Sequence, residues 1–169
     1  PMRDVFPWLT PIGDATQFID RLAGIVDHVD LFEAFDNKEV WQLASRMPCY
    51  RAPAGSVLIG EGDFGDFGLF VLRGKVGVFK RDASGATRRI GEAGIGETLG
   101  EMSMVDGQPR TASCIADEEV DFAVLDRDGL SSIIADDPKL GAKILIELVQ
   151  HLSAKLRSAS QRLAEQVAV

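Results

Sequence analysis

The chain has 169 residues, of which 46% are hydrophobic and 26% charged, a balance typical of one globular domain rather than a disordered segment. Its formal net charge of −8 argues against a nucleic-acid-binding surface, which needs clustered lysine and arginine, and against attachment to an anionic membrane. No apolar run reaches the roughly 20 residues of a membrane span, and Cys49 and Cys114 lack the spacing of metal ligands. We therefore expect a single domain over residues 1–169, without metal, in a reducing cytoplasmic setting.

The N-terminal segment, residues 1–47, is predicted to be helical after an irregular lead-in of twelve residues that carries three prolines. Apolar residues recur at helical spacing from about Asp14 to Phe35, and either Asp14 or Thr16 is placed to cap this helix. Asp36 or Asn37 then caps a second helix. Such aromatic-rich helices are expected to cover a core rather than to bind a cofactor.

Residues 48–125 change to short β-like runs separated by glycine-containing turns, a pattern that indicates a sandwich or barrel. A helical turn at about Met102–Val105 interrupts them. The predicted strands contain Val57–Ile59, Leu69–Leu72, Val76–Phe79, Arg88–Ile90, Thr111–Ala116 and Asp121–Leu125.

Residues 126–169 return to a helical pattern. Asp126 or Asp128 can cap a short helix, and Asp137-Pro138 opens a longer one. The longer helix carries an apolar stripe along its length, which consists of Leu140, Ile144, Leu148, Leu152 and Leu156. The apolar face around this stripe is wide enough to need partners on two sides. We expect the barrel on one side and a second copy of the chain, in a homodimer, on the other.

The stretch over residues 97–114 carries the candidate binding residues. Gly100 lets a ligand approach the backbone closely, because glycine has no Cβ. Glu101 offers two oxygens that accept hydrogen bonds from hydroxyl groups, and Arg110 offers a planar fork that binds a phosphate bidentately. An acid for a sugar and an arginine for a phosphate on one short loop suit a nucleotide whose phosphate lies close to its ribose.

This stretch resembles the phosphate-binding cassette of the cyclic nucleotide-binding domain family, in its bacterial, CRP/FNR-like form. Gly100-Glu101-Met102-Ser103-Met104-Val105 and the later Pro109-Arg110-Thr111-Ala112 match the family pattern without a gap, although Leu99 stands where Phe is usual. Glycines at the family's turn positions extend the resemblance over residues 45–130. The resemblance implies an antiparallel, cupin-like jelly-roll β-barrel with N-terminal helices and a long C-terminal helix.

By this resemblance, Glu101 would hold the ribose 2′-hydroxyl and Arg110 the cyclic phosphate, helped by backbone N–H groups. Val78 and Ile90 are candidates for packing against the base, and Ser160 for capping it from the C-terminal helix. Thr111 also suits cyclic GMP, so we expect cyclic AMP binding with cyclic GMP tolerated. The candidate ligand-binding residues are Gly100, Glu101, Met102, Ser103, Arg110, Thr111, Ala112, Val78, Ile90 and Ser160.

Two other functions remain open at this point. One is a non-binding dimerisation module of the same fold, which has no need of the pair Glu101 and Arg110. A simpler alternative for the loop itself is that Glu101 and Arg110 merely pair with each other. The other, less supported, is a cupin-like enzyme, which would need more histidines than His28 and His151 if it used a metal. We expect no enzyme but a regulatory sensor, in which ligand binding moves the C-terminal helix and signals to an unidentified output partner.

Overall fold

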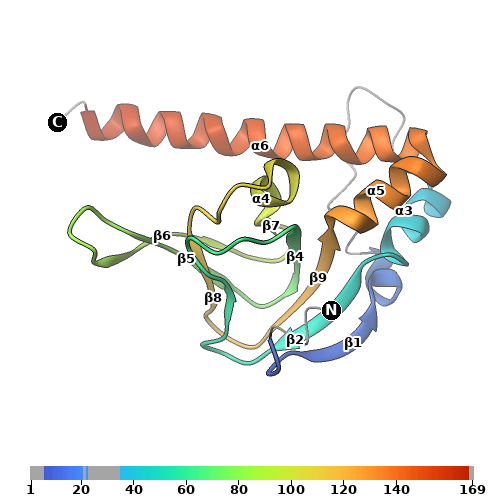
Figure 1. Cartoon of the computed structure of the whole chain (residues 1–169), viewed down its shortest axis with the longest axis horizontal. Coiled ribbons are helices and arrows are strands. Elements are labelled where there is room, and N and C mark those ends of the chain that lie inside the picture. The colour runs from blue at the N-terminus through green and yellow to red at the C-terminus, as the bar shows by residue number, and fades with distance from the viewer. Residues whose placement is uncertain (1–5, 21, 23–34, 168–169) are drawn as a thin grey trace.

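The computed structural model describes residues 6–20, 22 and 35–167, which fold into a β-roll flanked by helices (Figure 1). The fold is mainly antiparallel β with a long C-terminal helix, as the sequence predicts. In chain order the elements are β1 (Thr10–Asp14), η1 (Ala15–Phe18), α3 (Asn37–Ala44), β2 (Pro48–Ala52), β3 (Val57–Ile59), β4 (Phe67–Arg73), β5 (Val76–Arg81), β6 (Thr87–Ala93), β7 (Thr98–Leu99), α4 (Glu101–Asp106), β8 (Ser113–Ala116), β9 (Val120–Asp126), α5 (Arg127–Asp136) and α6 (Pro138–Val167).

Two sheets form the roll. One has five strands in the order β1-β2-β9-β4-β7, and the other has four in the order β3-β8-β5-β6. Strands distant in sequence pair with each other, β2 with β9 and β3 with β8, and both pairings are antiparallel. These pairings bring the two ends of the β region together and hold α4 and its flanking loops against the roll. The closer likeness to cupins stays a prediction.

Both faces of β4 are buried, and they contact two different cores. Phe70 and Leu72 belong to a cluster between the five-stranded sheet and the helices, whereas Leu69 and Val71 belong to a cluster inside the roll. This division follows from the strand geometry, since successive side chains point to opposite faces of a sheet. The strand therefore reads as a continuous apolar run rather than as an alternating one.

The helix starts agree with the capping signals in the sequence. Asp36 caps α3 and forms a capping box with Glu39, each side chain accepting a hydrogen bond from the other residue's backbone N–H. The Asp126 carboxylate accepts from Gly129 N at 2.7 Å at the start of α5, and α6 begins at Pro138.

The prediction of an irregular lead-in is wrong for its second part, because Thr10–Asp14 form β1 against β2. This strand lies at the edge of its sheet, where a proline such as Pro11 is tolerated because its missing N–H is not needed in the ladder. The predicted helix from Asp14 begins as the short 3₁₀ helix η1, with the Asp14 side chain accepting from Thr16 N at 3.0 Å. Most of the rest of that prediction lies outside the described residues.

Only the first half of α6 is buried. Leu140, Ile144 and Leu148 pack into the core, and Lys143 forms a buried ion pair of 2.6 Å with Glu39 of α3. The later part of the helix continues past α4, on the side of the molecule where the β5–β6 hairpin extends (Figure 1). Within the described residues, no helix combines the length and the apolar composition that crossing a membrane requires.

Candidate ligand-binding site

Gly100 turns the chain from β7 into α4. Its φ angle is 76°, in the left-handed region that favours glycine. A Cβ at this position would also lie only 2.6 Å from Arg110 Nη1 and 2.7 Å from Ile59 Cδ1. Glycine is therefore needed here both for the backbone conformation and for the close approach of the arginine.

The far end of α4 is held by Arg127, the first residue of α5. Its Nε donates to Met104 O at 3.0 Å and its Nη2 to Ser103 O at 3.2 Å. The guanidinium thereby gives a donor to Met104 O and a second donor to Ser103 O, which also accepts from Gly107 N at 2.9 Å. The short helix is thus positioned by Gly100 at its N-terminal end and by Arg127 at its C-terminal end. The N–H groups of its first turn lie at the Gly100 end.

Arg110 is buried and held by main-chain carbonyl groups. Its side chain is 5% exposed, and it donates from Nη1 to Gly100 O at 2.6 Å and from Nη2 to Phe67 O at 2.8 Å. The guanidinium also lies 4.4 Å from the centroid of the Phe67 ring, a cation–π contact. Burial lowers the pKa of Arg110 below its usual value, but arginine remains charged near neutral pH.

The loop between β3 and β4 positions the backbone of Arg110 as well. Arg110 N donates to Asp63 O at 2.8 Å, and Gly62 N donates to Arg110 O at 2.8 Å. Gly65 of the same loop lies against the side chain, since a Cβ there would be 2.7 Å from Arg110 Nη2. A loop that is distant in the sequence thus helps to determine where the guanidinium lies.

Glu101, the first residue of α4, is 3% exposed and forms an ion pair with Lys155 of α6. Lys155 Nζ donates to Glu101 Oε1 and also to Thr98 O at 2.8 Å. The ion-pair partner of Glu101 is therefore Lys155, and not Arg110 as one alternative interpretation of the sequence required. Sequence reasoning missed Lys155, because no local pattern links a helix residue to a carboxylate 54 positions earlier.

The cassette residues surround a cavity of about 140 Å³. This volume is below the roughly 300–1,000 Å³ of most small-molecule pockets, so it suits a sugar-phosphate group better than a whole nucleotide. Its lining consists of Ile59, Val78, Leu99, Gly100, Glu101, Met102, Ser103, Arg110, Thr111, Ala112, Cys114 and Lys155.

Eight of the ten candidate residues, from Gly100 to Ala112 together with Val78, thus line one cavity. Ile90 does not, because it lies on β6 with 49% of its surface exposed. Ser160 is exposed on α6 and is also absent from the lining. It follows Lys155 by five residues, which places it roughly 140° around the helix. The base-contacting roles of Ile90 and Ser160 stay predictions that this cavity does not support.

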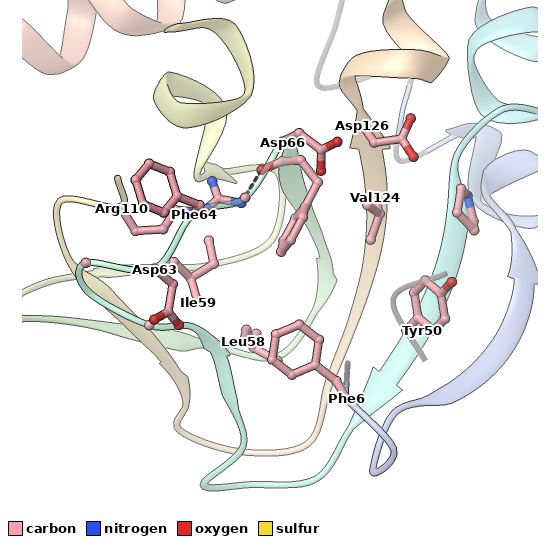
Figure 2. A pocket seen from close by; sticks show the side chains of 15 residues that line it. Phe6, Tyr50, Leu58, Ile59, Asp63, Phe64, Asp66, Arg110, Val124 and Asp126 are labelled. Carbon is pink, nitrogen blue, oxygen red and sulfur yellow. Dashed lines mark hydrogen bonds between the residues drawn. The ribbon is translucent and has the colours of Figure 1, made fainter. Parts of the chain in front are cut away.

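A larger cavity of about 850 Å³ shares Arg110 and Ile59 with the first one. Figure 2 shows it between the β3–β4 loop and the aromatic residues Phe6 and Tyr50, with the Arg110 side chain at one end. The dashed line in that view is the hydrogen bond from Arg110 to the Phe67 carbonyl. The guanidinium therefore lies where the two cavities adjoin.

Cys114 contributes a neutral thiol to the lining of the smaller cavity. It is 4% exposed, and burial raises its pKa to about 11. A thiol is a poor nucleophile and metal ligand until it ionises. Within the described part of the chain, no group of three His, Cys, Asp or Glu side chains is arranged to hold a metal ion.

The comparison with known families agrees with the resemblance found in the sequence of the cassette. A sequence model described as the cyclic nucleotide-binding domain matches residues 50–137, which contain Glu101, Arg110 and most of the roll. The chain belongs to this family. The matched segment contains every residue that lines the smaller cavity except Lys155.

Three relatives are informative about cyclic nucleotide-binding domains of this kind. The "CRP-like cAMP-activated global transcriptional regulator" of Mycobacterium tuberculosis is 28% identical over 141 residues, which cover 83% of this chain and 61% of the regulator. The chain therefore spans less than two thirds of that relative. A crystal structure of a cyclic nucleotide-binding domain from Methylobacillus flagellatus has 42% identity and a TM-score of 0.92, over 96% of this chain and 91% of that one.

The third relative is the regulatory domain of Toxoplasma gondii PKA, solved in complex with cAMP. It has 27% identity and a TM-score of 0.61, and the match covers 71% of this chain and 46% of that one. The similarity shows that a protein kinase regulatory domain has a fold similar to that of this chain.

Proposed function

We propose that this domain binds cyclic AMP as a regulatory ligand and also accepts cyclic GMP. The observation that carries the proposal is the presence of buried Glu101 and buried Arg110 in the lining of one cavity, beside the N-terminal turn of α4. An acceptor for a sugar hydroxyl and a cation for a phosphate are the two groups that a cyclic nucleotide requires. The activation of the mycobacterial relative by cAMP and the cAMP complex of the Toxoplasma domain support this choice of ligand.

In this proposal, the ribose 2′-hydroxyl donates to the Glu101 carboxylate, and the cyclic phosphate accepts from Arg110. The two hydrogen bonds from Arg110 to carbonyl oxygens use two of the five N–H donors of a guanidinium. The remaining donors, with the first-turn N–H groups of α4 and the backbone near Thr111, are available to the phosphate oxygens. Val78 and Ile59 supply the apolar wall.

The output in this proposal is a change in the position of α6, within a homodimer. The helix carries Lys155, which contacts the cassette, and an apolar seam that begins beside the buried residues and continues along the exposed second half. The seam residues follow the alternating spacing of three and four that is typical of a coiled coil. They are Leu145, Val149, Leu152, Leu156, Ala159 and Leu163.

We propose a sensor role without catalysis, since nothing in the lining of the cavity suggests a reaction on the ligand. Because the chain spans only part of the mycobacterial regulator, the transcriptional regulation for which that relative is named is not transferred to this domain.

Isothermal titration calorimetry on the whole chain tests the ligand. We expect cyclic AMP to bind more tightly than cyclic GMP, and 5′-AMP to bind far more weakly because its phosphate is not closed onto the ribose. A cyclic dinucleotide serves as a further control. Absence of binding by both cyclic mononucleotides would refute the proposal and would favour the non-binding dimerisation module.

A further inference from the structure

The larger cavity, of about 850 Å³, has no part in the proposed cyclic nucleotide function apart from the two residues that it shares with the smaller one. Its lining comes from β2 and β9 of one sheet, from β3 of the other sheet and from the loop between β3 and β4. It therefore lies at the opening of the roll between the two sheets. Its volume falls within the roughly 300–1,000 Å³ of most small-molecule sites.

Aromatic rings from three separate segments form much of the wall of this larger cavity. Phe6 precedes β1, Tyr50 lies on β2, and Phe67 is the first residue of β4. Leu58 and Val124 contribute aliphatic surface from β3 and β9 (Figure 2). The faces of aromatic rings carry partial negative charge, so a wall of this kind attracts organic cations as well as apolar groups.

The carboxylates of the lining outnumber its one cation. Asp63, Asp66 and Asp126 each carry one negative charge and Arg110 carries one positive charge, so the formal net charge of the lining is −2. Arg110 lies at one end of the cavity and Asp126 toward the other (Figure 2). The three aspartates are exposed residues, so their attraction for a cation depends on salt. The balance of charge selects cations and disfavours anions.

Two polar groups of the lining have unused hydrogen-bonding capacity. Tyr50 is only 8% exposed, yet its hydroxyl has no hydrogen-bond partner among the residues that the structure describes. Asp126 accepts from Gly129 N through Oδ1, which leaves Oδ2 available. Burial raises the pKa of Tyr50, and the negative charge of Asp126 raises it further. Because buried hydroxyl groups are normally hydrogen-bonded, the unpaired Tyr50 hydroxyl points to a polar group of a ligand.

We propose that the larger cavity is a second ligand site, which binds an organic ammonium ion with an aromatic body. The aromatic body packs against the rings of Phe6 and Tyr50 and the side chain of Val124. The ammonium group donates to the Asp126 carboxylate and to the oxygen of the Tyr50 hydroxyl. This inference goes beyond the proposed function and does not depend on it, because the cassette residues Gly100 to Ser103 do not line this cavity.

Three indole compounds that differ in charge test the chemistry of the site. Tryptamine carries an ammonium group, tryptophol is neutral, and indole-3-acetate is an anion. In calorimetry on the full chain at low ionic strength, we expect tryptamine to bind roughly tenfold more tightly than tryptophol. Indole-3-acetate should bind more weakly than either, and added sodium chloride should reduce the advantage of tryptamine.

Nuclear magnetic resonance on the same chain tests the place of binding. The amide signals of Gly62 and Gly65, in the loop that lines the cavity, should shift when tryptamine is added. The signals of Gly85 and Gly91, on the β5–β6 hairpin and outside the lining, should stay unchanged. Shifts confined to the hairpin, or spread evenly over the surface, would overturn the proposed location.

Variants of the lining separate the charge, the hydroxyl and the space. Asp126→Asn keeps a residue that can cap α5 and should weaken tryptamine binding roughly threefold while tryptophol binding stays within about twofold. Glu118→Gln is the matched control, because it removes a negative charge from an exposed residue outside the lining. Tyr50→Phe keeps the ring and should also weaken tryptamine binding roughly threefold. Val124→Phe fills the cavity and should abolish the binding of both compounds, while thermal unfolding checks that it folds.

The outcomes distinguish this inference from the proposed function. If the chain binds tryptamine here but neither cyclic mononucleotide, this inference stands and the proposed function fails. If it binds cyclic AMP but shows equal affinity for the three indole compounds, or none for tryptamine, the proposed function stands and this inference fails. Equal losses in Asp126→Asn and Glu118→Gln, or full binding by a folded Val124→Phe, would also overturn the inference.

Discussion

At the scale of single residues, the Arg110 side chain is expected both to stabilise the fold and to bind the ligand. Its guanidinium donates hydrogen bonds to Gly100 O and Phe67 O, and it also lines the cavity where we place the phosphate. A lysine at this position would keep the charge but lose the planar fork, so it could not serve both carbonyl groups and a phosphate at once. Affinity and stability are therefore expected to change together when this residue is altered.

Arg110→Ala should lower the affinity for cyclic AMP by about 2–5 kcal/mol, because the phosphate loses its buried counter-charge. It should also lower the free energy of unfolding by about 1–3 kcal/mol, since two buried carbonyl groups lose a donor. Calorimetry and urea unfolding measure the two effects. Arg88→Ala is the control, because Arg88 is exposed on β6 and pairs with Asp82. Unchanged affinity in Arg110→Ala would contradict the site.

Gly65 offers a way to move the guanidinium without deleting it. A Cβ on Gly65 would lie 2.7 Å from Arg110 Nη2, the flexible end of that side chain, so Gly65→Ala should displace the guanidinium while the roll stays intact. We expect roughly tenfold weaker cyclic AMP binding and a change in unfolding free energy below about 1 kcal/mol. Gly91→Ala, which meets no atom within 4 Å, should leave affinity unchanged. Equal affinities of the two variants would show that Arg110 adjusts without loss.

At the scale of elements, the sequence predicts the parts with strong local signals and misses those that depend on distant partners. The capping box of α3 and the Pro138 start of α6 are visible as residue patterns. β1 and the two-residue β7 carry no such pattern, because each exists only through its pairing with another strand. The cassette was predictable because its binding groups lie within eleven residues of each other, whereas Lys155 approaches it only through the path of α6.

Two truncations of α6 separate the contribution of Lys155 from that of Ser160. Both keep the buried anchors Leu140, Ile144 and Leu148, so the helix should remain attached to the core. A chain that ends at Ala159 keeps Lys155 and lacks Ser160, and it should bind cyclic AMP as the full chain does. A chain that ends at Ser153 lacks both and should bind roughly tenfold more weakly. If the chain that ends at Ala159 binds cyclic AMP weakly, Ser160 is again the candidate for capping the base.

At the scale of the whole molecule, the two buried thiols make the fold sensitive to high pH. Burial raises the pKa of Cys49 from 9.0 to about 12 and that of Cys114 from 9.0 to about 11. The folded state therefore keeps its thiol protons above pH 9, where the unfolded chain releases them. This contribution to stability is fully present below pH 9 and is lost as the pH rises through about 9–12.

We expect the free energy of unfolding to fall between pH 9 and 11, by up to about 1.4 kcal/mol per pH unit for each thiol. Urea unfolding of the parent chain and of Cys49→Ala, at several pH values, measures the contribution of this thiol, since all other titratable side chains are the same in the two proteins. The slope should be shallower in the variant. Parallel curves for the two proteins would mean that the Cys49 thiol does not control this loss.

The apolar surface of α6 concerns the assembled molecule. Val149, Leu156 and Leu163 are each more than 60% exposed and are spaced seven residues apart. Met102 and Val105 of α4 continue this surface around a groove of about 450 Å³ that also includes Leu156. A stripe with heptad spacing on the exposed second half of a helix matches the seam of a two-stranded coiled coil, so a second α6 is the partner that we expect to fit it.

Leu156→Glu should therefore abolish self-association, because it places a charge at the centre of the proposed seam, where two copies would meet with like charges. Stable homodimers persist at a concentration of about 10 μM. In sedimentation analysis at this concentration, the parent chain should be a dimer and the Leu156→Glu variant should be a monomer. Ser158→Glu adds the same charge two residues away, outside the seam, and should remain dimeric. Both variants should keep their cyclic AMP binding site, because neither residue lines the smaller cavity. A monomeric parent chain, or a dimeric Leu156→Glu variant, would refute assembly through α6. The output partner would then have to bind a different surface of the domain.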